Sequence, residues 1–71
     1  MNRRVEEELH RKMLQLMAEH DMCCAAVGRA MGYHPNSVIY HMNKVQDETG
    51  LDPRTFYGLC ELLGYEKKEK P

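Results

Sequence analysis

The sequence predicts an all-α fold, a small domain of four helices. Apolar residues recur at intervals of three and four along four segments, which is the spacing of an amphipathic helix. Glycine or proline separates these segments, and no alternating apolar and polar run is long enough for a strand. A chain of 71 residues suffices for one domain. We expect this domain over residues 1–64, followed by a charged, flexible tail over residues 65–71.

The first predicted helix covers residues 2–20. Its apolar stripe should face the core and consists of Val5, Leu9, Met13, Leu16 and Met17. Glutamates 6 to 8, Arg11 and Lys12 should form the solvated side. The stripe is long enough to supply core contacts and, in a homodimer, contacts with a second copy.

The second predicted helix is short. Asp21 is the expected N-cap, and the apolar side consists of Cys24, Val27 and Met31. Gly32 follows the last apolar residue, where a left-handed C-cap favours glycine. The second helix should therefore end at this glycine.

Two further helices follow, each with a proline near its start. Pro35 suits the first turn of the third helix, because the N–H that proline lacks would have no partner there. Gly50 should end this helix, and its buried side consists of Val38, Met42 and Val45. Asp52 as N-cap and Pro53 should begin the fourth helix, which Gly64 ends. The apolar residues of the fourth helix are Phe56, Leu59, Cys60 and Leu63.

The second and third helices match the pattern of a helix-turn-helix, two helices joined by a tight turn with glycine. The first helix of such a pair needs a small residue where the second crosses it, and Gly28 occupies this position. Gly32 supplies the positive φ of the turn, and Tyr33 should fill the angle between the helices. The third helix would then present polar side chains to base edges in the major groove. Its N-terminal amides would favour a backbone phosphate.

The third helix carries no acidic residue before Asp47, and its polar side chains are hydrogen-bonding groups. This composition predicts a surface that binds double-stranded DNA. The candidate base or phosphate contacts are His34, Asn36, Ser37, Tyr40 and His41, with Arg29 and Lys44 as the candidate cations. We expect the affinity to be modest and to rise as the histidines protonate below about pH 6.5.

The run VGRAMGYHPNSVIYHMNKVQDETGLDP, residues 27–53, resembles the C-terminal helix-turn-helix of the PucR/CdaR family of bacterial transcriptional regulators. The resemblance covers about residues 22–63 and rests on Asn36, Ser37, Tyr40 and the Thr-Gly-Leu-Asp turn of residues 49–52. It implies DNA binding in a transcription regulator. Where that family typically has arginines, this chain has Pro35, Ile39, His41 and Asn43. We therefore expect fewer phosphate contacts than in the family.

Two further expectations concern the family context. We expect no ligand-sensing region of the kind that usually precedes this domain, and therefore a stand-alone binding module with no small-molecule effector. The segments VGRAMG and NSVIYHMNKV are also similar to the DNA-binding domain of the replication initiator DnaA. Both resemblances imply the insertion of one helix into duplex DNA. One such helix contacts few base pairs, so we expect a homodimer that binds two half-sites.

A net charge of -1 keeps a second class open, because affinity for phosphate comes largely from Lys and Arg. This alternative is a helical protein–protein interaction module that keeps the fold without binding DNA. The two classes differ in salt dependence, which should be steep for phosphate contacts and slight for an apolar protein interface.

The cysteines and histidines predict neither a metal site nor an enzyme. His20, Cys23 and Cys24 are close in sequence, but adjacent residues on a helix point about 100° apart and no C-x₂-C pair exists. Cys23 beside His20 is the one local candidate for nucleophilic catalysis, and an 8.3 kDa bundle has little room for a cleft. We expect no cofactor. An odd number of cysteines, no signal peptide and no long apolar run favour a cytoplasmic protein with free thiols and no membrane segment.

Overall fold

The computed structural model describes the backbone of residues 3–64 and the side chains of residues 5–64. It contains four helices, α1 (Arg3–Glu19), α2 (Cys24–Met31), α3 (Pro35–Thr49) and α4 (Phe56–Leu63). No strand occurs among these residues. The predicted all-α, four-helix fold is confirmed. The predicted charged tail, residues 65–71, lies outside the described residues, and within them no helix has the length and apolar character needed to cross a membrane.

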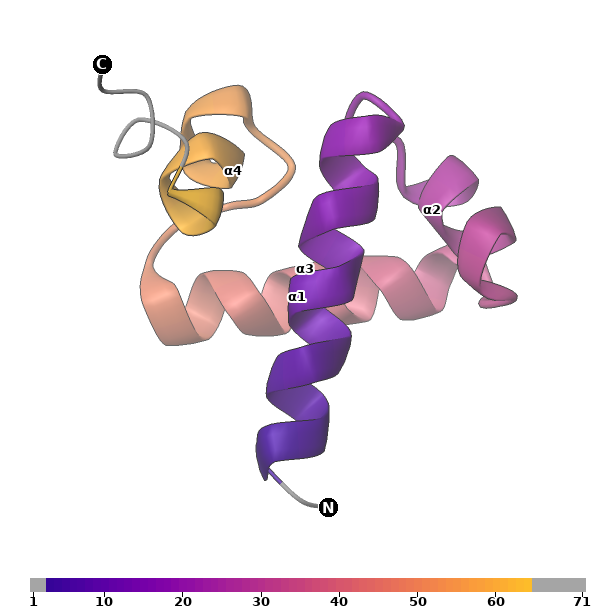
Figure 1. The fold of residues 1–71 in the computed structure, drawn as a ribbon, viewed down its shortest axis with the longest axis horizontal. Coiled ribbons are helices and arrows are strands. Elements are labelled where there is room, and N and C mark those ends of the chain that lie inside the picture. The colour runs from indigo at the N-terminus through magenta and orange to yellow at the C-terminus, as the bar shows by residue number, and fades with distance from the viewer. Residues whose placement is uncertain (1–2, 65–71) are drawn as a thin grey trace.

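The helix α1 runs across α3, with α2 on one side of α1 and α4 on the other (Figure 1). The most extensive packing between helices joins α2 to α3, and α4 packs on α1. The N-terminal turns of α1 extend past α3 (Figure 1). This arrangement covers the side of α3 that faces α1 and α2 and leaves its opposite side to solvent.

All four helices contribute to one core. Its buried residues are Met13, Leu14, Met17, Val27, Val38, Met42 and Leu59. The predicted inward positions of α3, Val38, Met42 and Val45, are all buried. Since most of the core lies on the stripes that the spacing predicts, helical periodicity locates the packed side of each helix correctly.

Two residues that the spacing places in the core lie on the surface instead. Val5 is 54% exposed and Phe56 is 71% exposed. Val5 belongs to the turns of α1 that extend past α3 (Figure 1). Phe56 is the first residue of α4, where the chain enters the helix from the turn. The prediction that both face the core is wrong, because each lies in the first turn of its helix, ahead of the positions that pack in the core.

Asp21 does not cap α2. Asp21 and Met22 have φ values of 54° and 62°, in the left-handed region, and the N-cap is Cys23, whose side chain makes no capping hydrogen bond. The Met22 amide instead donates to the Met17 carbonyl oxygen at 2.6 Å. The predicted cap is wrong because Asp21 belongs to the turn that ends α1 and reverses the chain.

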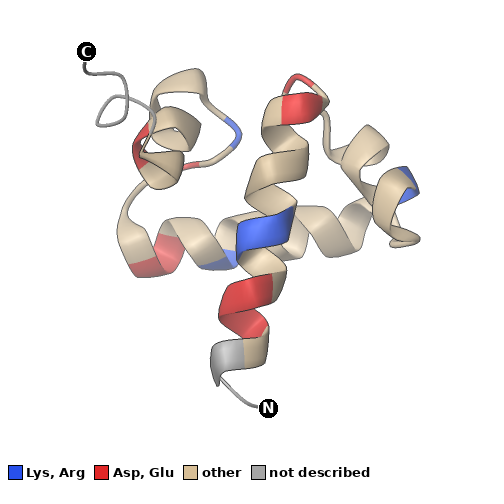
Figure 2. Ribbon diagram, in the orientation of Figure 1, with Lys and Arg blue, Asp and Glu red and all other residues tan. Residues whose placement is uncertain are grey.

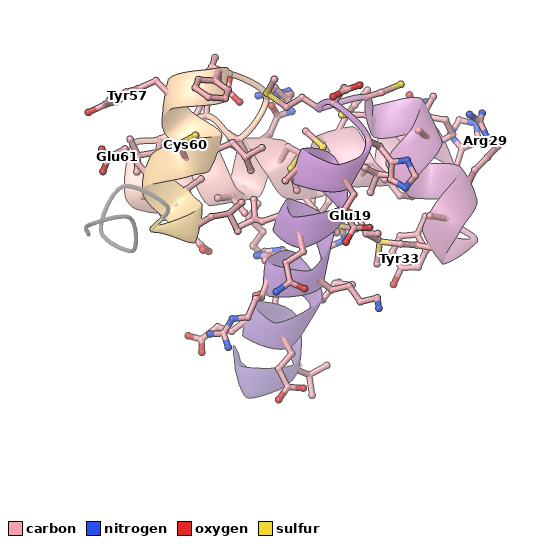
Figure 3. All side chains as sticks on the ribbon, turned by 45° about the horizontal axis from the view of Figure 1, so that its top comes forward. Glu19, Arg29, Tyr33, Tyr57, Cys60 and Glu61 are labelled. Atoms are coloured by element: carbon pink, nitrogen blue, oxygen red, sulfur yellow. The ribbon has the colours of Figure 1, made fainter. Side chains whose placement is uncertain are left out.

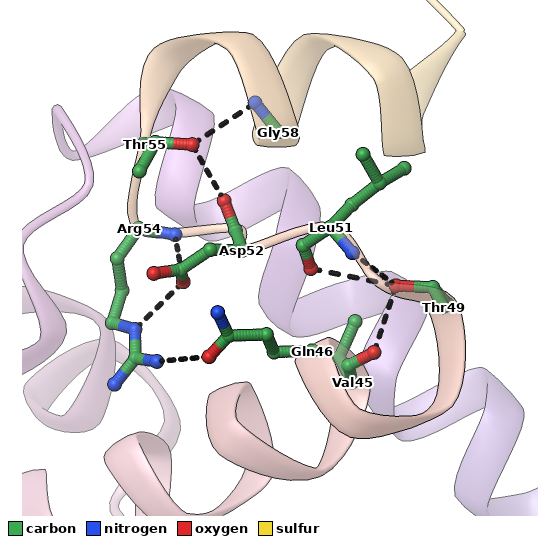
Figure 4. A network of polar contacts seen from close by, with 8 residues as sticks. All are labelled: Val45, Gln46, Thr49, Leu51, Asp52, Arg54, Thr55 and Gly58. Carbon is green, nitrogen blue, oxygen red and sulfur yellow. Dashed lines mark hydrogen bonds and ion pairs between the residues drawn. The ribbon is translucent and has the colours of Figure 1, made fainter.

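Asp52 and Pro53 form a turn ahead of α4 and are not its first residues. One Asp52 carboxylate oxygen accepts hydrogen bonds from the Arg54 amide at 3.0 Å and from Arg54 Nε at 2.8 Å (Figure 4). The N-cap is Thr55, whose hydroxyl accepts from the Gly58 amide at 3.0 Å. The predicted start of this helix is therefore three residues too early. Asp52 and Pro53 instead lie in the turn that reverses the chain between α3 and α4.

The turn between α2 and α3 has the predicted glycines. Gly32 has a φ of 78° and ends α2. A Cβ atom added to Gly28 would lie 2.6 Å from the Tyr33 carbonyl oxygen, so only glycine fits at this crossing. Tyr33 itself is exposed and does not fill the angle between the helices as predicted. The turn packs its backbone directly on α2, where the Tyr33 amide donates to the Gly28 carbonyl oxygen at 2.8 Å.

Candidate nucleic-acid interface

The solvent side of α3 presents a compact group of uncharged side chains. At about 100° per residue, Asn36, Tyr40 and Asn43 fall within roughly 60° of arc, on the side opposite the buried Val38. All three are exposed, Tyr40 by 59%. Ser37 and Ile39 are also exposed and lie beside this stripe. We call these five residues the outer face of α3: Asn36, Ser37, Ile39, Tyr40 and Asn43.

The sequence predicts only part of this surface. The predicted DNA contacts Asn36, Ser37 and Tyr40 lie together on it, whereas Ile39 and Asn43 are not among the predicted contacts. The spacing of Asn36, Tyr40 and Asn43, at i, i+4 and i+7, places Asn43 on the same side of the helix and was the available signal. No signal in the sequence marked Ile39, because an apolar residue on a helix is more often buried.

His34 caps α3, which changes the expected role of this helix end. Its Nδ1 accepts a hydrogen bond from the Asn36 amide at 3.0 Å, and its carbonyl oxygen accepts from the Ser37 amide at 2.9 Å. Pro35 has no N–H. The predicted phosphate site at the N-terminal amides of α3 is wrong, because these amides already have partners. The exposed His34 ring, through its other nitrogen, is the group left for a ligand.

His41 and Lys44 lie on the side of α3 that meets α1. Lys44 Nζ is 2.7 Å from Glu6 Oε2, and His41 Nδ1 is 3.0 Å from Nε2 of the buried His10. The hydrogen bond to Glu6 raises the pKa of Lys44, and the same bond lowers the pKa of Glu6. Each of these two candidate residues thus already has a partner on α1, and both border the outer face: the centroid of the His41 ring lies 5.2 Å from that of Tyr40, and Lys44 lies one turn beyond Tyr40.

The His41 ring is held in the neutral form by its surroundings. Partial burial lowers the pKa of His41 below its ordinary value of 6.5, and the neighbouring His10 lowers it further. Glu6 acts in the opposite direction, while Lys44 again lowers it. The expected rise in DNA affinity with protonation should therefore reach His41 only at a more acidic pH than an ordinary histidine.

Acidification should destabilise the contact between α1 and α3. A lowered pKa in the folded state means that protonation of His41 favours unfolding, so its stabilising effect is complete above about pH 6.5 and is lost as the pH falls through the folded-state value. We expect a lower unfolding temperature at about pH 5 than at about pH 7.5, and a smaller difference in His41→Gln, which cannot titrate. Thermal unfolding at both pH values measures this. His20→Gln, a histidine outside the pair, is the control, and an equal reduction in both variants would contradict the assignment.

Arg29 is the cation placed for a ligand on this side of the molecule. The ion pairs within the described residues join Lys44 to Glu6 and Arg54 to Asp52, so Arg29 has no such partner among them. It is exposed, and it projects from α2 away from the core (Figure 3). Acidic residues lie on the N-terminal turns of α1, at its C-terminal end and in the turn that follows, and at the C-terminal end of α3, whereas the first turns of α3 are uncharged (Figure 2). A polyanion would therefore meet the start of α3 with the least repulsion.

The remaining reactive side chains do not form a second site. The three cysteines are free thiols, and burial raises the pKa of Cys24. Among residues 5–64, no three His, Cys, Asp or Glu side chains are grouped closely enough to hold a metal ion. Phe56 and Tyr57 are exposed together on α4. Tyr57 and Arg29 lie at opposite ends of the molecule, so the aromatic pair is separate from this arginine (Figure 3).

Comparison with known proteins gives one match. The family model of the PucR C-terminal helix-turn-helix domain matches residues 10–63. This range begins within α1 and ends with α4, so it includes both helices of the helix-turn-helix. No curated protein matches the chain, and no solved structure does.

Proposed function

The chain belongs to the PucR C-terminal helix-turn-helix family, and on this premise we propose that it binds double-stranded DNA sequence-specifically with α3 in the major groove. Membership of this family indicates a DNA-binding regulator. The observation that carries the finer proposal is the outer face of α3, which presents amide and hydroxyl groups to solvent without a carboxylate. Action as a transcription regulator in the bacterial cytoplasm belongs to the same proposal.

The candidate residues divide into three roles under this proposal. Asn36, Tyr40 and Asn43 would contact base edges, since their side chains combine donors and acceptors and lie on one side of α3. Arg29 and the free nitrogen of His34 would contact phosphates on either side of the groove. His41 and Lys44 would act indirectly, because their contacts with His10 and Glu6 hold α3 against α1.

Few cations near α3 should make binding weakly dependent on salt, and Arg29 should account for a large part of that dependence. We expect Arg29→Ala to weaken binding about equally for all sequences and to reduce the slope of log K against log salt by about 0.9, the contribution of one neutralised phosphate. Fluorescence anisotropy of a labelled duplex over a series of salt concentrations measures the slope. Arg11→Ala, an exposed arginine on α1, is the matched control. An equal change in both variants would contradict the role of Arg29.

An NMR titration of the labelled protein with mixed-sequence duplex DNA tests the proposal directly. We expect shift changes at Arg29 and along residues 34–43 that diminish at high salt. Changes that are absent, or restricted to residues of α4, would overturn it. His20 and residues 5–8, on other parts of the molecule, serve as internal controls.

We also propose that the protein binds as a homodimer, since one recognition helix contacts few base pairs. Met13 and Met17 of the α1 stripe are fully buried within the chain, so this stripe is not free for a second copy. The exposed aromatic pair on α4 is the apolar surface that remains for it, with Tyr57 68% exposed. We expect Phe56→Ser combined with Tyr57→Ser to weaken self-association at least tenfold, or about 1.4 kcal/mol. Sedimentation equilibrium measures this, with Tyr33→Ser as control, and an unchanged dimer or a monomeric parent chain would contradict it.

Two observations favour a second function. The pairing of Lys44 with Glu6 leaves little positive charge on α3, and the aromatic pair on α4 suits a protein partner. In that case the chain would be a protein–protein interaction module. The anisotropy series above separates the two, because a protein–protein module of this kind would show no salt-dependent binding to the duplex.

A further inference from the structure

We propose that the outer face of α3 selects A·T base pairs, with the side-chain amides of Asn36 and Asn43 each bound to an adenine. This inference rests on the proposed function, and it specifies which DNA the same surface binds. Three features of α3 lead to it: the lack of a free cation, the availability of the two amides, and the exposed apolar side chain between them.

The first feature disfavours guanine. Guanine presents two acceptors in the major groove, N7 and O6, and its commonest specific contact is a bidentate one from Arg or Lys. Residues 35–43 include neither. Lys44 is the one cation of α3, and its ammonium nitrogen is paired with the Glu6 carboxylate at 2.7 Å. The outer face thus lacks a free cation of the kind that most often contacts guanine.

The second feature favours adenine. An asparagine amide offers a donor and an acceptor side by side, which match N7 and the N6 amino group of adenine. Asn36 uses its backbone amide to bond with His34, and the hydrogen bonds of α3 within the described residues leave its side chain and that of Asn43 unused. Both amides project to solvent from a helix that the core holds rigidly.

The third feature concerns the paired thymine. Ile39 is 37% exposed and lies beside the stripe, within one turn of both asparagines. An isoleucine contributes an apolar contact, and the C5-methyl group of thymine is the apolar group in the major groove. Opposite the polar edge of a G·C pair, the same side chain would leave base groups without a partner.

The spacing along α3 sets the expected pattern of bases. Asn36 and Asn43 are seven residues apart, or about 10 Å along the helix axis at 1.5 Å per residue. Base pairs are 3.4 Å apart in a strand, so the two adenine contacts should be separated by about three base pairs. Asp47 lies one turn further on the same side of α3, and its carboxylate opposes insertion beyond Asn43.

Selection from a pool of duplexes with a randomised centre, using the complete chain at low salt, tests the inference. We expect enriched duplexes to carry A·T pairs at two positions about three base pairs apart. Replacing either pair with G·C should weaken binding roughly 5- to 100-fold. Replacing the adenine with 7-deazaadenine, which keeps base pairing but lacks N7, should also weaken binding by the parent chain.

Matched variants connect each base with its residue. Asn43→Ala should lose the adenine preference at one position and should show no further loss with 7-deazaadenine there. Asn43→Gln, whose amide can form the same pair of hydrogen bonds, should keep the preference. Ile39→Ser should reduce the difference between thymine and uracil opposite the adenine. Gln15→Ala, an exposed position on α1, is the control, and circular dichroism checks that each variant is folded.

The outcomes distinguish this inference from the function on which it rests. Salt-dependent binding with enrichment of G·C pairs, or with no base preference, would overturn the A·T inference and leave DNA binding intact. No binding to any duplex in the pool would overturn both.

Discussion

Gly58→Ala is expected to remove most of the stability of the fold. A Cβ atom at this position would lie 2.1 Å from the carbonyl oxygen of Asp52 and 2.8 Å from the Thr55 hydroxyl. That carbonyl cannot move freely, because the Thr55 hydroxyl donates a hydrogen bond to it at 2.8 Å (Figure 4). The turn that carries Asp52 is also held by Arg54, which bonds to Gln46 on α3 at 3.1 Å. The added methyl group must therefore push the whole turn away from α4.

Two opposing effects decide the size of this loss. Alanine stabilises a helix interior by about 1 kcal/mol relative to glycine. Overpacking against backbone costs about 1–3 kcal/mol and occasionally more, and here the overlap is severe. We expect a net loss of about 2–3 kcal/mol, from a domain whose size limits its stability to about 3–5 kcal/mol. Chemical denaturation followed by circular dichroism measures the free energy of unfolding.

An exposed position on another helix supplies the control. Gln15 lies on α1, so Gln15→Ala should change the free energy of unfolding by less than about 0.5 kcal/mol. If Gly58→Ala proved as stable as this control, the close packing of α4 on the Asp52 turn would be wrong.

The sequence predicts the helices better than it predicts the turns between them. Helical periodicity is a local property, so the stripes that contain Met13, Val38 and Leu59 identify the buried sides correctly. Asp21 and Asp52 are both good N-cap residues by type. Each lies instead in a turn that reverses the chain. The distance that such a turn must span depends on how the helices pack, and helical periodicity does not give that distance.

The candidate site shows the same limit. Periodicity alone indicates that Asn36 and Tyr40 share one side of α3, opposite its apolar residues. It does not indicate where α1 crosses. Lys44 and His41 are paired with residues 38 and 31 positions earlier in the chain, Glu6 and His10. A contact between residues so far apart follows from tertiary packing, so the reduced availability of these two candidates could not be predicted from the third helix itself.

Gly28→Ala should weaken both the stability of the fold and DNA binding. The added Cβ atom would lie 2.6 Å from the Tyr33 carbonyl oxygen and 3.4 Å from the Pro35 nitrogen, both of which are backbone atoms of the turn into α3. Relief of this overlap must move the start of α3 away from α2. We expect a loss of about 1–2 kcal/mol of stability, smaller than for Gly58→Ala because the overlap is less severe and alanine again favours the helix.

The displacement acts where the proposed contacts are made. Arg29 lies on α2, while Asn36 and Tyr40 lie on the first turns of α3, so a change in the angle between the two helices separates the phosphate contact from the base contacts. We expect at least tenfold weaker DNA binding, or about 1.4 kcal/mol, at a temperature at which the variant remains folded. Anisotropy titration measures the affinity, and circular dichroism measures the folded fraction.

Arg29→Ala is the control for the loss of the phosphate contact alone, and it should weaken binding equally for all sequences. Gly28→Ala should also reduce the difference in affinity between preferred and other duplexes. Equal discrimination in both variants would mean that the angle between α2 and α3 does not position the outer face.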